Sequence, residues 1–112
     1  MNQPQWSIDA ARETWAVPHW SAGYVDVGAG GKLLVRPRRG DGPALALPEV
    51  VDAAQAAGAR LPLLVRFADI LDDRRSRLQG AFAQAMRDWD YGGRYTLIYP
   101  IKVNQQKQVA GA

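Results

Sequence analysis

The sequence contains no cysteine, which excludes a disulfide framework and a zinc site built on thiolates. It has no apolar run close to the roughly 20 residues that a membrane-spanning helix needs, and its apolar stretch at residues 61–65 contains Pro62. The first residues, Met1 to Trp6, lack the basic and apolar regions of a signal peptide. These absences predict a soluble, cytoplasmic protein without a membrane partner.

The composition indicates a folded chain that is long enough for one small domain at most. Its 112 residues include 4 Trp, 4 Tyr and 2 Phe, more aromatic residues than a disordered chain carries. The net charge of +3 and the basic clusters at residues 36–39 and 74–77 are compatible with a nucleic-acid-binding module. Acidic residues lie close to both clusters, so no continuous basic stripe forms, and no aromatic residue lies between the arginines. We therefore expect no nucleic-acid partner. The acidic residues are Asp41, Asp69, Asp72 and Asp73.

The first half of the chain predicts a hairpin followed by a short helix. Residues 1–23 show little periodicity and predict an irregular lead-in. Residues 24–27 and 32–36 are rich in β-forming residues and flank a glycine-rich tetrapeptide, which is typical of a hairpin. After a loop at residues 37–43, Pro48 can open a helix that Gly58 ends in a left-handed conformation. Its predicted buried residues are Val50, Val51, Ala54 and Ala57.

The second half alternates predicted strands and helices. Residues 61–67 and 95–103 predict strands, and residues 105–112 predict the opening of a further helix. Between the strands, Asp69 is a candidate N-cap for a helix that ends at residues 91–93. One face of this helix carries Leu71, Leu78, Phe82, Met86 and Trp89. The β/α order predicts the start of a parallel sheet or barrel that needs further strands, and therefore a truncated domain.

Lys102, near the end of the second predicted strand, is the candidate catalytic residue. Because side chains alternate between the two faces of a strand, Lys102 would lie on the same face as Ile98 and Thr96. In an apolar surrounding, desolvation would lower the pKa of its amine, and the neutral amine can attack an aldehyde to form a Schiff base. The alternative is a lysine that extends from the strand end into water.

Three other features predict no chemistry. The spacing of Gly28–Gly31 fits neither a dinucleotide-binding loop nor a P-loop, and a turn accounts for it. His19 has no cysteine and no second histidine with which to bind a metal, so no metal ligand is predicted. Asp72 and Asp73 are adjacent on a helix and face different directions, which favours solvated acidic residues in the first turn.

The segment Tyr99-Pro100-Ile101-Lys102-Val103-Asn104-Gln105 resembles the motif that carries the pyridoxal phosphate (PLP) lysine in biosynthetic arginine decarboxylases. Further similarity to this family runs in order from Trp15 to Val109. It includes residues 19–24 with Asp26-Val27, residues 60–62, Phe67, residues 69–71 and Arg74. Ala22 stands where the family pattern has glycine, a departure that touches no chemistry.

The resemblance implies an α/β fold, an incomplete piece of a PLP-binding β/α barrel preceded by strands of a β domain. Residues 1–67 would hold the lead-in, the hairpin and β-domain strands with one short helix. Residues 68–112 would hold the truncated start of the barrel, with residues 95–103 as its first strand. Pro100 is unfavourable inside a strand because proline donates no backbone hydrogen bond. It is acceptable here because the family motif has a proline at this position, near the strand end.

The resemblance also implies the function. Lys102 would bind PLP and act in a carbon–carbon lyase that converts L-arginine to agmatine and CO2, in polyamine and specifically spermidine biosynthesis. Mg²⁺ and assembly into a homo-oligomer are implied by the resemblance alone. Because the other active-site groups would lie beyond Ala112, we expect this chain alone to be inactive. The alternative to a decarboxylase fragment is a small PLP-binding or carrier protein of related barrel fold.

Overall fold

The structure, a computed structural model, describes residues 5–111 and divides them into two compact units. Unit 1 ends at Arg66 and unit 2 begins at Phe67. Residues 1–4 of the predicted lead-in, and Ala112, lie outside the described residues. Each unit is described by itself below.

Unit 1 is built on a three-stranded antiparallel sheet. Strands β1 (Val25–Val27) and β2 (Leu33–Val35) pair with Val25 opposite Val35, and β3 (Leu45–Ala46) pairs with the other edge of β2. The predicted hairpin is therefore confirmed, while β3 was not predicted. A single turn, η1 (Ala29–Gly31), connects β1 to β2, and the left-handed φ of +67° at Gly30 and +78° at Gly31 explains why glycine stands there.

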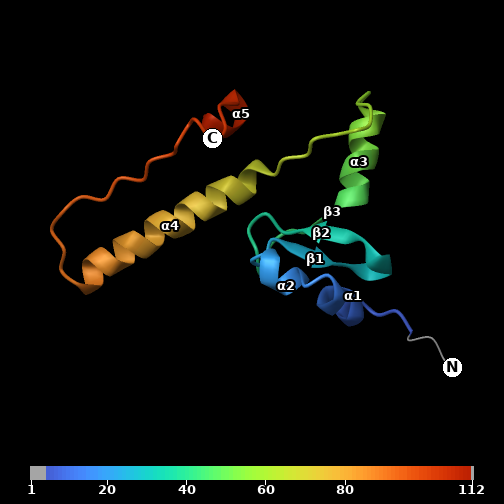
Figure 1. The fold of residues 1–112 in the computed structure, drawn as a ribbon, viewed down its shortest axis with the longest axis horizontal. Coiled ribbons are helices and arrows are strands. Elements are labelled where there is room, and N and C mark those ends of the chain that lie inside the picture. Colours follow the sequence, from blue (N-terminus) through green and yellow to red (C-terminus); the bar gives the residue numbers. More distant parts are fainter. Residues whose placement is uncertain (1–4, 112) are drawn as a thin grey trace. The chain divides into compact units, whose positions relative to one another are not determined.

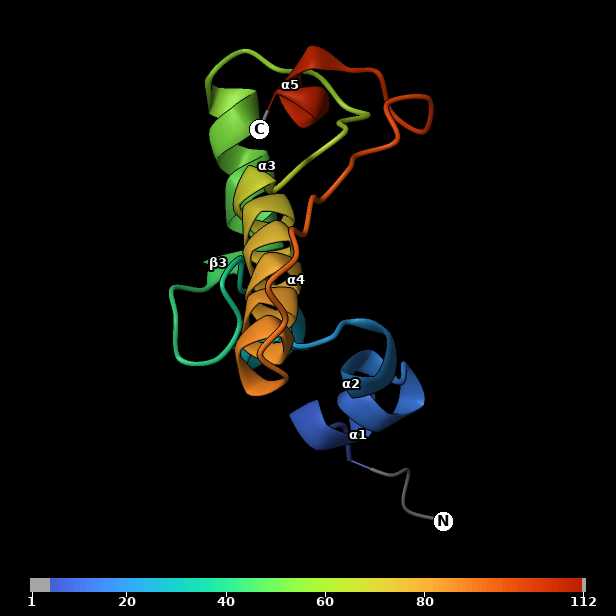
Figure 2. The same cartoon turned by 90° about the vertical axis from the view of Figure 1, so that its left-hand side faces the viewer.

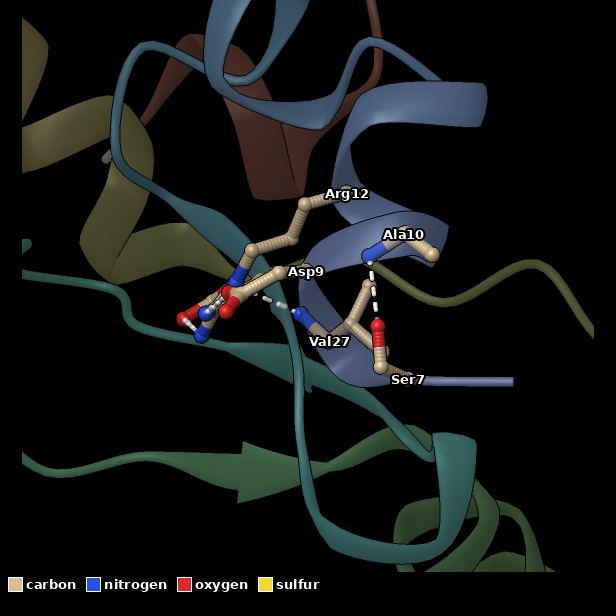
Figure 3. Close-up of polar contacts among 6 residues, drawn as sticks. Ser7, Asp9, Ala10, Arg12 and Val27 are labelled. Carbon is tan, nitrogen blue, oxygen red and sulfur yellow. Dashed lines mark hydrogen bonds and ion pairs between the residues drawn. The ribbon is translucent and has the colours of Figure 1, made fainter. Parts of the chain in front are cut away.

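The lead-in is helical, so the prediction of an irregular segment was wrong. Helix α1 (Ile8–Thr14) is capped by Ser7, whose Oγ accepts a hydrogen bond from the Ala10 backbone N at 3.0 Å (Figure 3). Helix α2 (Val17–Trp20) follows directly. No residue of α1 is buried, and a helix without a buried stripe shows no apolar periodicity in the sequence. Residues 5–66 thus contain three helices where the sequence predicts one.

The third of these helices, α3 (Leu47–Ala56), is the predicted one, with Pro48 in its first turn. Gly58 ends it with a φ of +96°, and the Ala59 N donates to the Ala54 O at 3.0 Å, which is the pattern of a glycine-ended helix. Of the four residues predicted to be buried, Val50, Val51 and Ala54 are only half-buried, and Ala57 is exposed because it already caps the helix end.

The small core of unit 1 lies where the helices meet the sheet. Its buried apolar residues are Val17, Tyr24, Val35 and Ala46. Helices α1 and α2 contact β1, and α3 contacts β2 and β3 on the other side (Figure 1). The central strand β2 carries the least exposed of these residues, Val35, at 4%.

Unit 2 consists of one long helix and a segment that runs back beside it. Helix α4 (Ala68–Asp88) is followed by irregular backbone that returns along the helix to a short helix, α5 (Lys107–Ala110) (Figures 1 and 2). The rings of Phe82 and Tyr95 stack with centroids 4.1 Å apart, which fixes the returning segment on the helix.

Both ends of α4 differ in detail from the prediction. Asp69 lies inside the first turn, and Phe67 occupies the N-cap position without a side-chain hydrogen bond. The helix ends at Asp88, and Asp90, two residues further on, has a left-handed φ of +48°, while the Tyr91 N donates to the Met86 O at 2.8 Å. The left-handed residue that terminates the helix is therefore Asp90, just before the predicted end at residues 91–93, and aspartate tolerates this conformation.

The strands predicted at residues 61–67 and 95–103 are not strands in this structure. A strand is defined by hydrogen bonds to a neighbouring strand, and neither segment has such a neighbour among residues 5–111. Residues 63–67 keep the alternation of a strand, since Leu63, Val65 and Phe67 are half-buried and Leu64 is exposed. The mixed α/β composition is confirmed, and the barrel stays a prediction.

The helices between residues 5 and 111 include none that is both long and apolar enough to span a bilayer.

Candidate functional site

Lys102 lies in a tight turn at the end of the returning segment. The Val103 N donates to the Pro100 O at 2.9 Å, so Lys102 is the third residue of a four-residue turn. Its side chain is exposed. The predicted position, at the end of an apolar strand and beside Ile98 on one strand face, is therefore not found, because residues 101–103 leave extended geometry.

Two hydrogen bonds close the loop that carries Lys102. Tyr99 Oη donates to the Asn104 backbone O at 2.9 Å, which joins the residues on either side of the turn. The Gln106 N donates to Asn104 Oδ1 at 3.0 Å, directly before α5 begins. The sequence predicts no role for Tyr99 beyond its place in the 99–105 motif, because a hydroxyl-bearing aromatic residue close to a turn is a weak signal.

A groove of about 490 Å³ runs between α4, the returning segment and α5. Tyr99 lines it, while Lys102 does not. Its lining combines apolar residues with three arginines, Arg74, Arg75 and Arg77. Its lining residues are Leu71, Asp72, Arg74, Arg75, Arg77, Leu78, Ala81, Leu97, Ile98, Tyr99, Val109 and Ala110.

The apolar face of α4 is less buried than the sequence predicts. Leu71, Leu78 and Phe82 are 39–45% exposed, and Trp89 is 84% exposed. The helix itself is as predicted, but unit 2 offers only one irregular segment and one short helix to cover it. Among the five predicted face residues, only Met86 reaches the half-buried class.

Two ion pairs join aspartates and arginines within α4. Arg75 Nη2 lies 2.8 Å from Asp72 Oδ1, and Arg77 Nε lies 2.7 Å from Asp73 Oδ2. Asp73 is buried, so the prediction of a solvated acidic residue was wrong for it. The pairing explains how a carboxylate can lie in that position, since a buried charge needs a partner.

Unit 1 contains a second groove, of about 650 Å³, between the lead-in helices and the hairpin. Its walls are mainly apolar and include three tryptophans that are 57–72% exposed. The lining residues are Trp6, Ala11, Trp15, Val17, Trp20, Val25, Asp26, Val27, Gly30, Gly31 and Leu33.

A bidentate ion pair at this groove joins α1 to β1. Arg12 Nε donates to Asp26 Oδ1 at 2.7 Å and Arg12 Nη2 donates to Asp26 Oδ2 at 2.9 Å, while Asp9 accepts from Arg12 Nη1 at 2.9 Å (Figure 3). The hydrogen bonds from Arg12 lower the pKa of Asp26, and those to Asp26 and Asp9 raise the pKa of Arg12. Because every charge here has a partner, the cluster is structural.

The remaining features singled out in the sequence are a turn and an exposed histidine. Gly28–Gly31 forms the hairpin connection, and His19 is exposed in α2. Within residues 5–111, no three side chains of the metal-binding types come together.

Comparison with known proteins finds no matching family model. Curated proteins named biosynthetic arginine decarboxylase are similar to nearly the whole chain. The protein from Xanthomonas campestris pv. campestris is 64% identical over 106 residues, which is 95% of this chain and 17% of that protein. Those from Xylella fastidiosa and Chromobacterium violaceum are 57% and 49% identical over 95% and 93% of this chain. The chain thus spans about 17% of the length of these relatives.

Proposed function

We propose that this chain is the amino-terminal part of a PLP-dependent arginine decarboxylase, because its resemblance to biosynthetic arginine decarboxylases is confirmed over 95% of its length. The reaction converts L-arginine to agmatine and CO2. The single observation that carries this proposal is identity of 64% with a protein of that name. Since the chain spans about 17% of that protein, we expect it to be inactive without the remaining polypeptide.

Lys102 is the residue that would hold the cofactor. Its exposed amine fits covalent attachment, because a lysine must be accessible to add to an aldehyde. When bound, PLP supplies the electron sink that decarboxylation of an amino acid requires. The groups that bury the lysine, bind the phosphate and recognise the guanidinium of arginine would come from the remaining polypeptide.

Other features of the family extend the proposal. They are a role in polyamine and spermidine biosynthesis, a cytoplasmic location, a β/α barrel, a Mg²⁺ requirement and assembly into a homo-oligomer. Their support is the sequence resemblance alone. Lys102 is the one residue of this chain to which we assign a catalytic role.

The proposal is tested by trapping PLP on the complete polypeptide encoded by the gene. The purified protein is incubated with PLP, reduced with borohydride, digested and examined by mass spectrometry. We expect a pyridoxyl group on Lys102 and agmatine formation from L-arginine. Lys102→Arg should abolish both, because a guanidinium keeps the charge and cannot form the bond. Lys107→Arg is the matched control and should leave both unchanged.

The outcomes separate the alternatives. Pyridoxyl on Lys102 without agmatine formation would favour a PLP-binding or carrier protein. Decarboxylation that survives Lys102→Arg would refute the assigned role of this lysine.

A further inference from the structure

The turn that carries Lys102 is held by few contacts of its own. One backbone hydrogen bond, from the Val103 N to the Pro100 O, closes it, and residues 100–103 are all exposed. A single exposed turn of this kind is weakly ordered, whereas a reacting group has to be held to within about 0.5 Å of its productive geometry. Within this chain, the contacts that order Lys102 therefore come from the residues around the turn.

Tyr99 connects this turn to the body of unit 2. It lines the same groove as Leu78 of α4 and Val109 of α5. Its hydroxyl donates to the Asn104 O, across the turn, at 2.9 Å. Tyr99 therefore lines the groove, and its hydroxyl also holds together the two ends of the loop that carries Lys102.

Asn104 extends the same connection toward α5. It is half-buried, unlike its neighbours at 101–103, and its Oδ1 accepts from the Gln106 N at 3.0 Å. The two hydrogen bonds form a chain from Tyr99 through Asn104 to the residue before α5. This chain spans Lys102 on both sides without contacting its side chain.

We infer that Tyr99 and Asn104 are positioning residues for Lys102, which set the direction in which its amine is presented to the cofactor. The inference rests on the proposed function, since it assigns a purpose to the loop only if Lys102 binds PLP. Neither residue is given a chemical step. Loss of either hydrogen bond should widen the range of orientations of the turn and weaken PLP binding at Lys102.

The test uses the complete polypeptide with PLP itself as the probe. Tyr99→Phe removes one hydroxyl and keeps the ring in the groove. The PLP dissociation constant, followed by absorbance of the lysine-bound cofactor, should rise roughly three- to tenfold, which corresponds to the loss of one hydrogen bond. The pH at which this absorbance changes should shift as well, because the lysine nitrogen is held less well. Tyr95→Phe is the matched control, with an identical deletion on a ring that stacks on Phe82, and should bind PLP as the wild type does.

Asn104 supplies a second pair of variants. Asn104→Ala removes the acceptor for the Gln106 N and should weaken PLP binding by a similar factor, whereas Asn104→Asp keeps the acceptor and should restore it. Urea unfolding of each variant detects a general loss of stability. A variant that unfolds more easily and yet binds PLP with wild-type affinity and wild-type pH dependence would overturn the inference.

Failure of the inference is distinguishable from failure of the proposed function. If borohydride places pyridoxyl on Lys102 of the wild type, and Tyr99→Phe and Asn104→Ala bind PLP as tightly as the wild type, only the positioning role is refuted. If Lys102 of the wild type takes up no pyridoxyl group, the proposed function and the inference both fall.

Discussion

Val35→Ala tests where the stability of unit 1 resides. Val35 is 4% exposed in the central strand, between Val25 on β1 and Leu45 on β3. The substitution removes two buried carbons, at about 0.8 kcal/mol each, and leaves a cavity that adds to the loss. We expect the free energy of unfolding to fall by about 1.5–2.5 kcal/mol, and the Tm of unit 1 by roughly 10 °C.

Urea unfolding of the chain, followed by tryptophan fluorescence and far-ultraviolet circular dichroism, measures this loss. The midpoint should fall while the slope with urea stays constant. Val103→Ala is the matched control: it removes the same two carbons from a side chain that is 73% exposed, and should change stability by less than about 0.5 kcal/mol. If Val35→Ala also changes the free energy of unfolding by less than about 0.5 kcal/mol, the placement of the core at β2 is refuted.

Two further predictions concern a charge and a backbone angle. Because the pKa of Asp26 is lowered from 3.8 in the folded chain, its contribution to stability is present above about pH 4 and is lost as the pH falls through the lowered pKa. Wild type should therefore exceed Asp26→Asn in urea midpoint at pH 7, with the difference shrinking toward pH 3, and an unchanging difference would contradict the ion pair with Arg12. Gly58→Ala should destabilise α3 by about 1 kcal/mol, because its φ is +96° and no atom lies within 4 Å of the new carbon, so the cost is backbone strain alone. Gly80→Ala, in the interior of α4 with equally open surroundings, should instead stabilise by about 0.5–1 kcal/mol; thermal unfolding that gives the two changes the same sign would refute this.

The elements that the sequence predicts correctly depend on short-range patterns. The hairpin follows from two β-rich runs around Gly28–Gly31, and α3 follows from Pro48 at its start and Gly58 at its end. Helix α4 follows from apolar residues spaced three, four and seven apart. The similarity to biosynthetic arginine decarboxylases was equally accessible, because a motif such as residues 99–105 depends only on the order of the residues and not on the fold.

The elements that the sequence predicts incorrectly depend on partners. Helix α1 buries no residue, so its stabilisation by Ser7 and by the sheet leaves no periodic signal. Residues 61–67 and 95–103 have the composition of strands, but composition cannot supply the neighbouring strand whose hydrogen bonds define one. The predicted face of α4 stays partly exposed for the same reason, since nothing in unit 2 is large enough to cover it.

The sequence by itself determined the similarity to biosynthetic arginine decarboxylases and the helices and hairpin whose signals lie within a few residues. The assignment of Lys102 as the cofactor lysine also comes from the sequence and stays a prediction. Only the tertiary structure decided which side chains meet across the chain. It pairs Arg12 with Asp26, fourteen residues apart, and it joins Tyr99 to Asn104 across the turn of Lys102. The physical reason is that a local pattern is set by the geometry of one helix or strand, whereas these contacts exist only after separate segments have packed together.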